Sequence, residues 1–278
     1  MGTCKFCGQP AGLWKSVHKE CDEKNAVGKQ EIAALVSRAI YRQELVPSLH
    51  QSLTAIRQSH WINDQTARSI IIEGWDKAVE RAFDDGVLTE EEEKNLVDIM
   101  DALGLSDDDL DRHGSYTKIV KGAVLRDLFN GIIPQRMRID GSVPFNLQRS
   151  EMLVWVFPDA KYLETNTRSR HLGWSTGTSV RICRGVYWRI GQFLSRSVPY
   201  TETTSYGGYL GVTTKHLYFS GSESGFRIPY DKIVSWEPYS DGIGITRGVA
   251  SAKPQLFVTG DGWFTYNLVM NLAQMHRA

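Results

Sequence analysis

The period of the hydrophobic pattern changes along this 278-residue chain, and that change constrains the fold more than any other sequence feature. Over residues 29–131 the apolar residues recur every three or four positions, as on one face of a helix. Over residues 145–278 they alternate with polar residues, as in half-buried strands. The sequence therefore predicts a multi-domain α+β chain, with a helical bundle over 29–131 and an antiparallel β-barrel or sandwich over 145–278.

Signals for helix ends divide the helical region into about four to six helices. The longest apolar stripe covers residues 67–82, with Asp64 as the expected N-cap. Thr89 and Glu92 have the spacing of a capping box, and Gly104 marks the end of the helix that they open. Apolar stripes of this kind are typical of helix–helix cores.

The acidic segment around Gly86 resembles the second half of a calcium-binding EF-hand loop, with Glu92 in the bidentate position. The first and third ligand positions hold Arg81 and Phe83, which do not coordinate calcium. We therefore interpret the segment as a helix end followed by a capped helix start, with acids near the positive end of the helix dipole. Residues 64–130, which include this turn, resemble the tellurite-resistance-type helical domains of bacterial stress proteins.

Three of the four cysteines lie within the first 21 residues, with a histidine among them. Cys4 and Cys7 form one pair separated by two residues, and His18 and Cys21 form a second pair with the same spacing. A tetrahedral zinc ion is typically held by two such pairs. Gly8 follows the first pair, where the chain turns sharply and a positive φ is expected. The segment resembles a zinc-ribbon or treble-clef finger in which three thiolates and one imidazole bind zinc.

The expected zinc site is structural, because four protein ligands leave no coordination position open for a substrate. A finger over residues 1–28 buries too little apolar surface to fold alone, so zinc is expected to supply much of its folding free energy. The alternatives are three free thiols with an incidental histidine, or a disulfide pair, which is disfavoured because nothing in the sequence indicates an oxidising compartment. Such a finger is expected to present a protein- or nucleic-acid-binding edge.

Short segments with strand character follow one another in the C-terminal region, separated by turns rich in Gly and Ser. They cover residues 152–157, 178–184, 187–191, 209–213, 216–220, 226–228, 233–239, 242–246 and 256–259. An amphipathic helix over residues 262–276 closes the chain. Many short strands at this spacing predict a small barrel or sandwich capped by a C-terminal helix.

Two motifs of this region resemble those of pleckstrin-homology (PH) and GRAM-type domains. The first is the hairpin of residues 208–219, GYLGVTTKHLYF, and the second is the step of residues 226–233, FRIPYDKI. The resemblance covers about residues 150–276. It implies a binding module of about seven antiparallel strands and a C-terminal helix, which takes anionic lipids in some members and proteins in many.

A short motif raises the alternative of a serine hydrolase. Residues 173–177 match G-x-S-x-G, with Ser175 as the nucleophile and His113, His171 or His216 as a candidate base. The motif requires a buried strand before the serine and a helix after it. Polar residues precede Ser175 and a strand pattern follows it, so we favour a loop between strands and expect a non-enzymatic protein.

The net charge of zero conceals two segments of opposite charge. Residues 84–111 contain twelve acidic residues and one lysine, a net charge of −11. Residues 112–200 contain fourteen basic and five acidic residues, a net charge of +9. Arginines interleaved with aromatic residues in the second segment are suited to phosphates of lipid headgroups or nucleic acid. The alternatives are solvated strand faces, or docking of the acidic segment on the basic one. The candidate anion-binding residues are Arg168, Arg170, Arg181, Arg184, Arg189 and Arg196.

The sequence contains no targeting signal that we identify. Its longest apolar runs span only a few residues, whereas a transmembrane helix needs about 20. The N-terminus lacks the apolar stretch of a signal peptide, and Phe6 stands where a myristoylation site has Ser or Thr. We therefore expect a soluble, cytoplasmic protein.

Together these features predict a zinc-containing, non-enzymatic binding or regulatory protein with a finger over 1–28, a bundle over 29–131 and a PH/GRAM-like domain over 145–278. Protein partners are the first expectation, and an anionic lipid surface is the second. The layout resembles that of modular bacterial proteins of stress response or defence. The alternatives are a nucleic-acid-binding zinc protein and a serine hydrolase that uses Ser175.

Overall fold

The computed structural model describes residues 2–12, 14–137, 142–165, 178–183, 186–190, 203–248 and 254–277. For residue 165, residues 178–183, residues 186–190 and residue 203 it describes only the backbone. The chain forms two compact units, the helical unit (Met1–Ala123) and the β unit (Val124–Ala278). The division into three domains stays a prediction, and the expected finger and most of the expected bundle belong to the helical unit.

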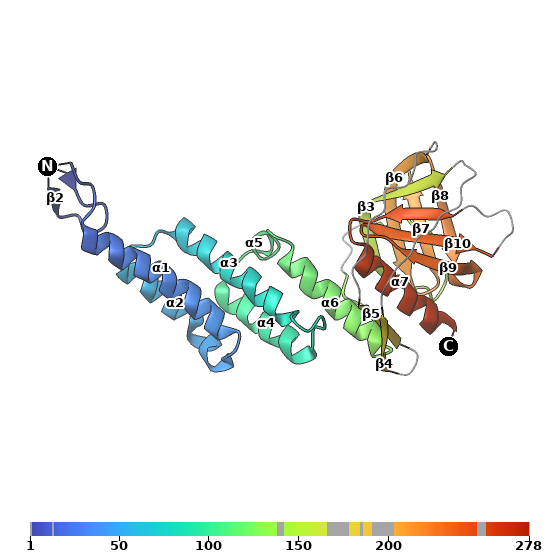
Figure 1. Cartoon of the computed structure of the whole chain (residues 1–278), viewed down its shortest axis with the longest axis horizontal. Coiled ribbons are helices and arrows are strands. Elements are labelled where there is room, and N and C mark those ends of the chain that lie inside the picture. Colours follow the sequence, from blue (N-terminus) through green and yellow to red (C-terminus); the bar gives the residue numbers. More distant parts are fainter. Residues whose placement is uncertain are drawn as a thin grey trace. The chain divides into compact units, whose positions relative to one another are not determined.

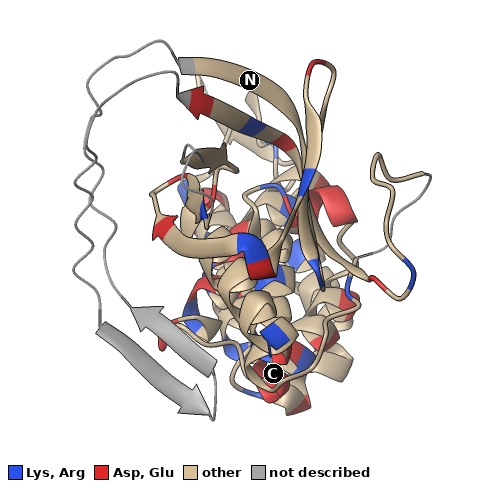
Figure 2. Ribbon diagram, turned by 90° about the vertical axis from the view of Figure 1, so that its right-hand side faces the viewer, with Lys and Arg blue, Asp and Glu red and all other residues tan. Residues whose placement is uncertain are grey.

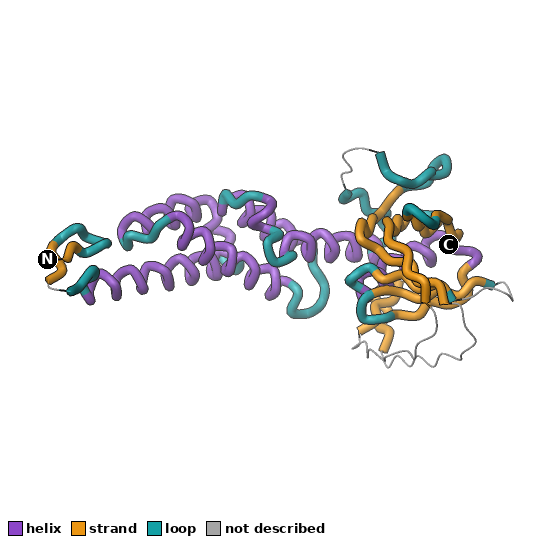
Figure 3. The backbone as a smooth tube through the Cα atoms, turned by 90° about the horizontal axis from the view of Figure 1, so that it is seen from above, coloured by secondary structure: helices purple, strands orange, loops and turns teal. Residues whose placement is uncertain are grey.

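The helical unit consists of a small β-hairpin followed by helices (Figure 1). The hairpin pairs β1 (Gly2–Thr3) with β2 (Pro10–Gly12). The helices are α1 (Lys19–Ala39), the 3-10 helix η1 (Gln43–Ser48), α2 (Leu49–Ser59), α3 (Asp64–Ala82), α4 (Glu90–Leu103), α5 (Asp107–Leu110) and the first part of α6 (Ser115–Phe129). The longer helices run side by side in Figure 3 and enclose a core that contains the fully buried Trp75. The helical region predicted from the sequence is confirmed.

Local sequence explains where these helices begin and end. Asn63, one residue before the expected Asp64, caps α3 by accepting a backbone N–H of its first turn. The predicted capping box of Thr89 and Glu92 is present at the start of α4. Gly104 ends α4 with a φ of 63°, a left-handed conformation that glycine adopts without a Cβ clash.

The β unit is a seven-stranded antiparallel sheet with helix α7 (Gly262–Arg277) packed on it (Figure 1). The strand order is β8-β7-β6-β3-β11-β10-β9. These strands are β3 (Leu153–Thr165), β6 (Thr203–Thr213), β7 (His216–Gly221), β8 (Gly225–Pro229), β9 (Ile233–Pro238), β10 (Gly242–Arg247) and β11 (Gln255–Val258), with the 3-10 helix η2 (Tyr230–Lys232) between β8 and β9. β3 and β11, which come first and last among these strands along the chain, pair with each other in the middle of the sheet. Two further strands, β4 (Thr178–Cys183) and β5 (Val186–Ile190), form a separate hairpin between β3 and β6 in the chain.

The buried face of α7 completes the core of the β unit. Trp155 on β3 meets Phe264 of α7 edge to face, with ring centroids 4.9 Å apart. Leu268 and Leu272 follow Phe264 at helical spacing and are buried in the same core. An α+β fold, with a helical region and an antiparallel sheet that carries a C-terminal helix, is therefore confirmed.

Strand β3 is much longer than the predicted segment of residues 152–157. Phe157, Ala160 and Tyr162 are all buried, so the inward-facing residues are three positions apart at one step instead of two. The pairing with β6 shifts register between Phe157 and Ala160, as at a β-bulge. The bulge carries the strand past Pro158, where the alternation that indicated a strand breaks off.

Candidate metal centre

The first two predicted ligands, Cys4 and Cys7, lie on the turn of the β1–β2 hairpin. The Gly8 N–H donates to the Cys4 carbonyl at 3.0 Å, and the Cys4 N–H donates to the Gln9 carbonyl at 2.8 Å. Gly8 has the positive φ expected of it, 74°. These bonds reverse the chain around Cys7 and keep the two thiols of the pair close together.

The other two ligands lie at the N-terminus of α1. His18 is the N-cap residue, and Cys21 lies in the first helical turn. Because the two residues are three positions apart at a helix start, their side chains share one face. The His18 N–H points at the Cys4 sulfur, 3.5 Å away, and the positive end of the helix dipole favours thiolate at this place.

The structure brings the four predicted ligands together. One donor atom from each of Cys4, Cys7, His18 and Cys21 lies within 4.8 Å of all the others. His18 Nδ1 lies 3.3 Å from Cys7 Sγ and 3.7 Å from Cys21 Sγ. Zinc bonds of about 2.3 Å to sulfur and about 2.0 Å to nitrogen place a sulfur and a nitrogen ligand roughly 3.5 Å apart in a tetrahedron. The two distances bracket that value, so the cluster can hold a metal ion, and its donor set fits zinc.

The second ring nitrogen of His18 determines which nitrogen faces the sulfurs. Nε2 lies 3.0 Å from the Pro10 carbonyl, which only accepts hydrogen bonds. Nε2 therefore carries the hydrogen, and Nδ1 presents its lone pair to the cluster. This hydrogen bond, followed by that with Cys7, raises the pKa of His18. Bonds of this type orient metal-bound histidines and increase their basicity.

The thiols of the cluster differ in acidity. Burial alone would raise the pKa of Cys4, but the backbone N–H groups of Cys7, His18 and Phe6 outweigh it and lower the pKa to about 6. Burial, followed by hydrogen bonds to the sulfurs of Cys7 and Cys4, raises the pKa of Cys21 to about 11. One thiolate is thus ready to bind a cation at neutral pH, and further binding must release protons.

Packing joins the turn between β1 and β2, which carries Cys4 and Cys7, to the helices. Phe6 stacks on Trp61, with ring centroids 6.0 Å apart and an interplanar angle of 25°. The Asn25 side chain donates to the carbonyls of His60 and Trp61 at 2.8 and 3.2 Å. Gly28 lies so close to His60 that a Cβ would stand 2.4 Å from that side chain. The segment that carries the cluster therefore packs against the helices of the same unit.

Most of the other predicted site residues are not described. Arg181 and Arg189 lie on β4 and β5, where only the backbone is described. Outside the described residues lie Arg168, Arg170, Arg184, Arg196, His171 and Ser175. The arginine site therefore stays a prediction, and so does the interpretation of the G-x-S-x-G motif as a loop between strands.

Glu92, which was weighed as a calcium ligand, has a structural role. Its Oε2 accepts from the Thr89 N–H at 2.9 Å and from the Thr89 hydroxyl at 2.8 Å. Asp85 Oδ1 accepts from the Val87 N–H at 3.0 Å. These bonds confirm a helix end followed by a capped helix start.

One acidic residue of the segment 84–111 is buried and paired within the helical unit. The Asp109 side chain is 3% exposed and bonds to Arg68 and, at 2.7 Å, to Arg112. The hydrogen bonds from Arg68 and then Ser106 lower the pKa of Asp109 to about 2. In Figure 2 acidic and basic residues are interspersed on the ribbon.

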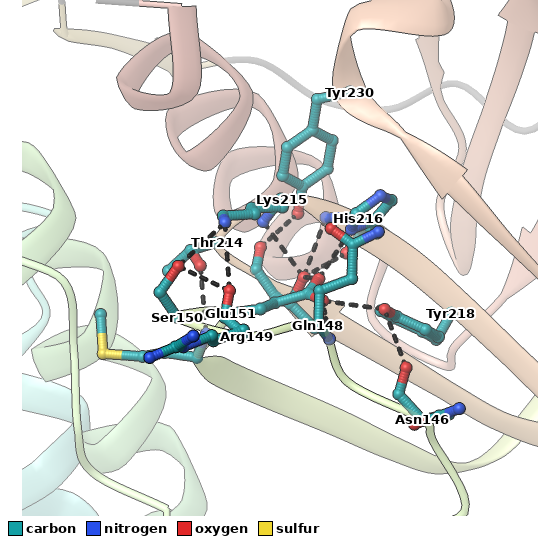
Figure 4. Close-up of polar contacts among 12 residues, drawn as sticks. Asn146, Gln148, Arg149, Ser150, Glu151, Thr214, Lys215, His216, Tyr218 and Tyr230 are labelled. Atoms are coloured by element: carbon teal, nitrogen blue, oxygen red, sulfur yellow. Dashed lines mark hydrogen bonds and ion pairs between the residues drawn. The ribbon is translucent and has the colours of Figure 1, made fainter.

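The sequence did not reveal a buried polar network around Glu151 in the β unit (Figure 4). The Glu151 side chain is 0% exposed. Its Oε1 accepts from the Thr213 hydroxyl and from His216 Nδ1 at 2.8 Å. Its Oε2 accepts from the Gln148 N–H and the Tyr218 hydroxyl, both at 2.8 Å. Burial would raise the pKa of Glu151, but these bonds, with that of Thr213 the strongest, lower it.

The network fastens the segment before β3 to the β6–β7 hairpin. Tyr218 also donates to the Asn146 carbonyl at 3.3 Å, and its ring packs against Phe145 with centroids 5.7 Å apart. Lys215 Nζ reaches Ser150 Oγ at 3.2 Å (Figure 4). Both carboxylate oxygens are occupied, so we assign the network a structural role. His216, named above as a candidate base, forms part of it.

A cavity of about 520 Å³ opens between helices of the helical unit. Its lining includes apolar residues such as Leu53 and the arginines Arg57 and Arg68. Arg57 bonds to Asp64, and Arg68 bonds to Asp109. Because both guanidinium groups already have carboxylate partners, the cavity gives no sign of a ligand.

Comparison with known proteins leaves the chain without an assigned family. No protein-family model matches it, and no curated protein matches it significantly. Among the described residues, every helix is too short or too polar to span a bilayer. The fold and the metal cluster therefore carry the functional inference.

Proposed function

We propose that this chain is a non-enzymatic recruitment protein with a structural zinc finger. Its β unit is a PH/GRAM-like domain that attaches the chain to an anionic surface through the arginine-rich segment between β3 and β6. A protein partner with an acidic surface is the alternative occupant. The finger takes no part in catalysis, because four protein ligands would complete a tetrahedral zinc site.

The strand order supports the PH/GRAM-like assignment. The resemblance implied about seven antiparallel strands and a C-terminal helix, and the β unit has seven antiparallel strands with α7 packed on the sheet. The motif of residues 208–219 falls on β6 and β7, and that of residues 226–233 falls on β8, η2 and the start of β9. A hairpin and a strand–turn–strand step at these positions are consistent with the proposed PH/GRAM-like domain.

The observation that carries the proposal is the place of the arginines in the chain. Residues 166–202 contain six arginines and one acidic residue, a net charge of +5. The strand residues on either side, Thr165 and Thr203, pair with each other, so both ends of this segment leave the sheet at one place. Each arginine close to an anionic membrane contributes about 1 kcal/mol, so the segment supplies enough attraction for reversible attachment.

Co-sedimentation of the full chain with vesicles tests the proposal. We expect binding to vesicles that contain phosphatidylserine, and none to neutral phosphatidylcholine vesicles. Neutralising Arg181, Arg184 and Arg189 together to Gln removes about 3 kcal/mol of attraction, so affinity should fall roughly a hundredfold.

The matched control neutralises Lys161, Lys232 and Arg247, which are exposed elsewhere on the β unit, and should weaken binding much less. Equal affinity of the triple arginine variant and the wild type contradicts the proposal. Salt-sensitive binding to oligonucleotides that the same arginine variant loses, without any vesicle binding, would instead favour the nucleic-acid alternative.

A further inference from the structure

A tryptophan next to the metal cluster is fully exposed. Trp14 lies between β2 and α1, and its side chain is 100% exposed, more than any other large apolar side chain described. A packed tryptophan buries about 150–250 Å². Trp14 therefore contributes no such burial to the packing of the finger.

The backbone holds Trp14 in this position at a cost. Its φ is 70°, in the left-handed region that costs a residue with a Cβ roughly 1–2 kcal/mol. The Lys5 N–H donates to the Ser16 carbonyl at 2.9 Å and fixes the loop to the hairpin. On the other side a Cβ at Gly2 would lie 2.2 Å from the Lys15 carbonyl, so the two backbones are in direct contact. The backbone conformation and contacts of this loop thus hold Trp14 in its exposed position.

The segment that carries Trp14 is positively charged up to the start of α1, where Glu20, Asp22 and Glu23 follow. Residues 2–19 contain three lysines and no Asp or Glu. Lys5, Lys15 and Lys19 are all exposed. Lys5 Nζ lies over the Phe6 ring, and Lys19 forms an exposed ion pair with Glu23, which contributes little in water and leaves both groups accessible. A bound zinc ion with three thiolates carries a charge of −1 and leaves the segment positive. An exposed indole in a segment with exposed ammonium groups is the combination that the boundary between a bilayer and water favours.

We propose that Trp14, Lys5, Lys15 and Lys19 form a second attachment site for an anionic lipid membrane. The indole enters the headgroup region, and the ammonium groups contact anionic headgroups. Single-stranded nucleic acid fits less well, because successive bases need successive stacking platforms. The neighbouring rings, Phe6 and Trp61, are stacked on each other, so Trp14 is the one free platform that the described part of the finger presents.

The inference rests on the proposed function, since both sites take the same anionic surface. Two weak sites on one chain strengthen attachment beyond either alone, as long as both reach the membrane. The finger would then contribute to attachment only when its loop is folded, which makes zinc a condition of full affinity.

Vesicle binding of full-chain variants tests the site. Trp14→Ala should lower affinity for phosphatidylserine vesicles about tenfold, the loss of one interfacial aromatic contact of about 1.4 kcal/mol. Trp14→Phe should retain part of the binding, because the ring remains apolar. Tyr41→Ala removes another exposed aromatic residue of the helical unit, 68% exposed, and should have no effect. Equal zinc content in all variants shows that the finger stays folded.

Quenching by brominated lipids provides a readout of depth. The wild type should lose tryptophan fluorescence on brominated anionic vesicles, and Trp14→Phe should lose less, the remaining loss coming from Trp174 and Trp188 of the arginine-rich segment. Wild-type affinity in Trp14→Ala, or equal quenching in Trp14→Phe, overturns the inference. So does a defect of Trp14→Ala in oligonucleotide binding with intact vesicle binding.

The outcomes also separate the two proposals. If the variant lacking Arg181, Arg184 and Arg189 loses vesicle binding while Trp14→Ala keeps it, only the finger site is wrong. If Trp14→Ala loses binding and the arginine variant keeps it, the finger site stands and the arginine segment is wrong. Absence of wild-type binding to any anionic vesicle overturns both.

Discussion

Replacing Glu151 by Gln tests whether a charged carboxylate holds the β unit together. The buried carboxylate accepts four hydrogen bonds, two at each oxygen. Glutamine has the same shape, but its amide nitrogen is a donor. In the best orientation the amide oxygen keeps the bonds from Gln148 and Tyr218, and the nitrogen faces Thr213 and His216.

The network can adapt in part to this change. The Thr213 hydroxyl can turn its proton to the His216 carbonyl, which is 2.9 Å away. The imidazole can move its proton to Nε2 and accept at Nδ1. The variant therefore exchanges charge-assisted bonds of about 1.5–3 kcal/mol for neutral ones of about 1 kcal/mol, without leaving every donor unpaired. We expect it to lower the free energy of unfolding of the β unit by about 2–3 kcal/mol.

The effect of pH provides a second readout. The folded-state pKa of Glu151 is lower than its ordinary value of 4.5. Its contribution to stability is therefore fully present above pH 4.5 and is lost as the pH falls through the folded-state pKa. The stability difference between wild type and Glu151→Gln should be constant near neutrality and narrow below pH 4.5.

Urea unfolding of the full chain, monitored by hydrogen exchange of the amides in β6 and β7, measures the stability difference between the wild type and Glu151→Gln locally. Glu223→Gln, in the exposed turn between β7 and β8, is the matched control and should leave exchange unchanged. A difference below about 0.5 kcal/mol at neutral pH, which is typical of surface substitutions, refutes the reasoning. A difference that persists unchanged in acid refutes the role of the charge.

Three further predictions concern the helices, the sheet and the hydrolase alternative. Thr89→Ala removes the capping box of α4 and should destabilise the helical unit by about 1 kcal/mol in urea unfolding; unchanged stability would contradict the cap. Gly211→Ala places a Cβ 2.6 Å from the Phe145 ring and should cost about 1–3 kcal/mol. Adding Phe145→Ala should give a less than additive loss, and strict additivity would count against that contact. A serine-reactive probe should label the wild type and Ser175→Ala equally. Labelling that disappears in the variant would favour the serine hydrolase alternative.

Much of the secondary structure was predictable because local signals agree with the fold. Strands β7 and β10 lie within one residue of their predicted bounds, since Gly- and Ser-rich turns bracket short alternating segments. The Cys/His cluster was predictable because two short pairs already specify the geometry that the helix start and the hairpin turn complete.

The remaining features depend on contacts between residues far apart in the sequence. The bulge after Phe157 shifts the buried positions of β3 by one residue. The alternation of apolar and polar residues is therefore interrupted there, and the sequence pattern does not predict the second half of the strand. The pairing of β3 with β11 joins residues about ninety positions apart, and no local pattern encodes it. The network of Glu151 likewise relies on Thr213 and His216, and a glutamate before an apolar strand is the one sequence signal for it.

Metal content tests the central claim, a zinc ion held by Cys4, Cys7, His18 and Cys21, most directly. Native mass spectrometry of protein purified without added zinc should give one zinc per chain. Cys4→Ser should lose that zinc and destabilise the helical unit, whereas replacement of the fourth cysteine of the chain, Cys183→Ser on β4, should keep it. Much less than one zinc in the wild type, together with unchanged stability of Cys4→Ser, would contradict the account.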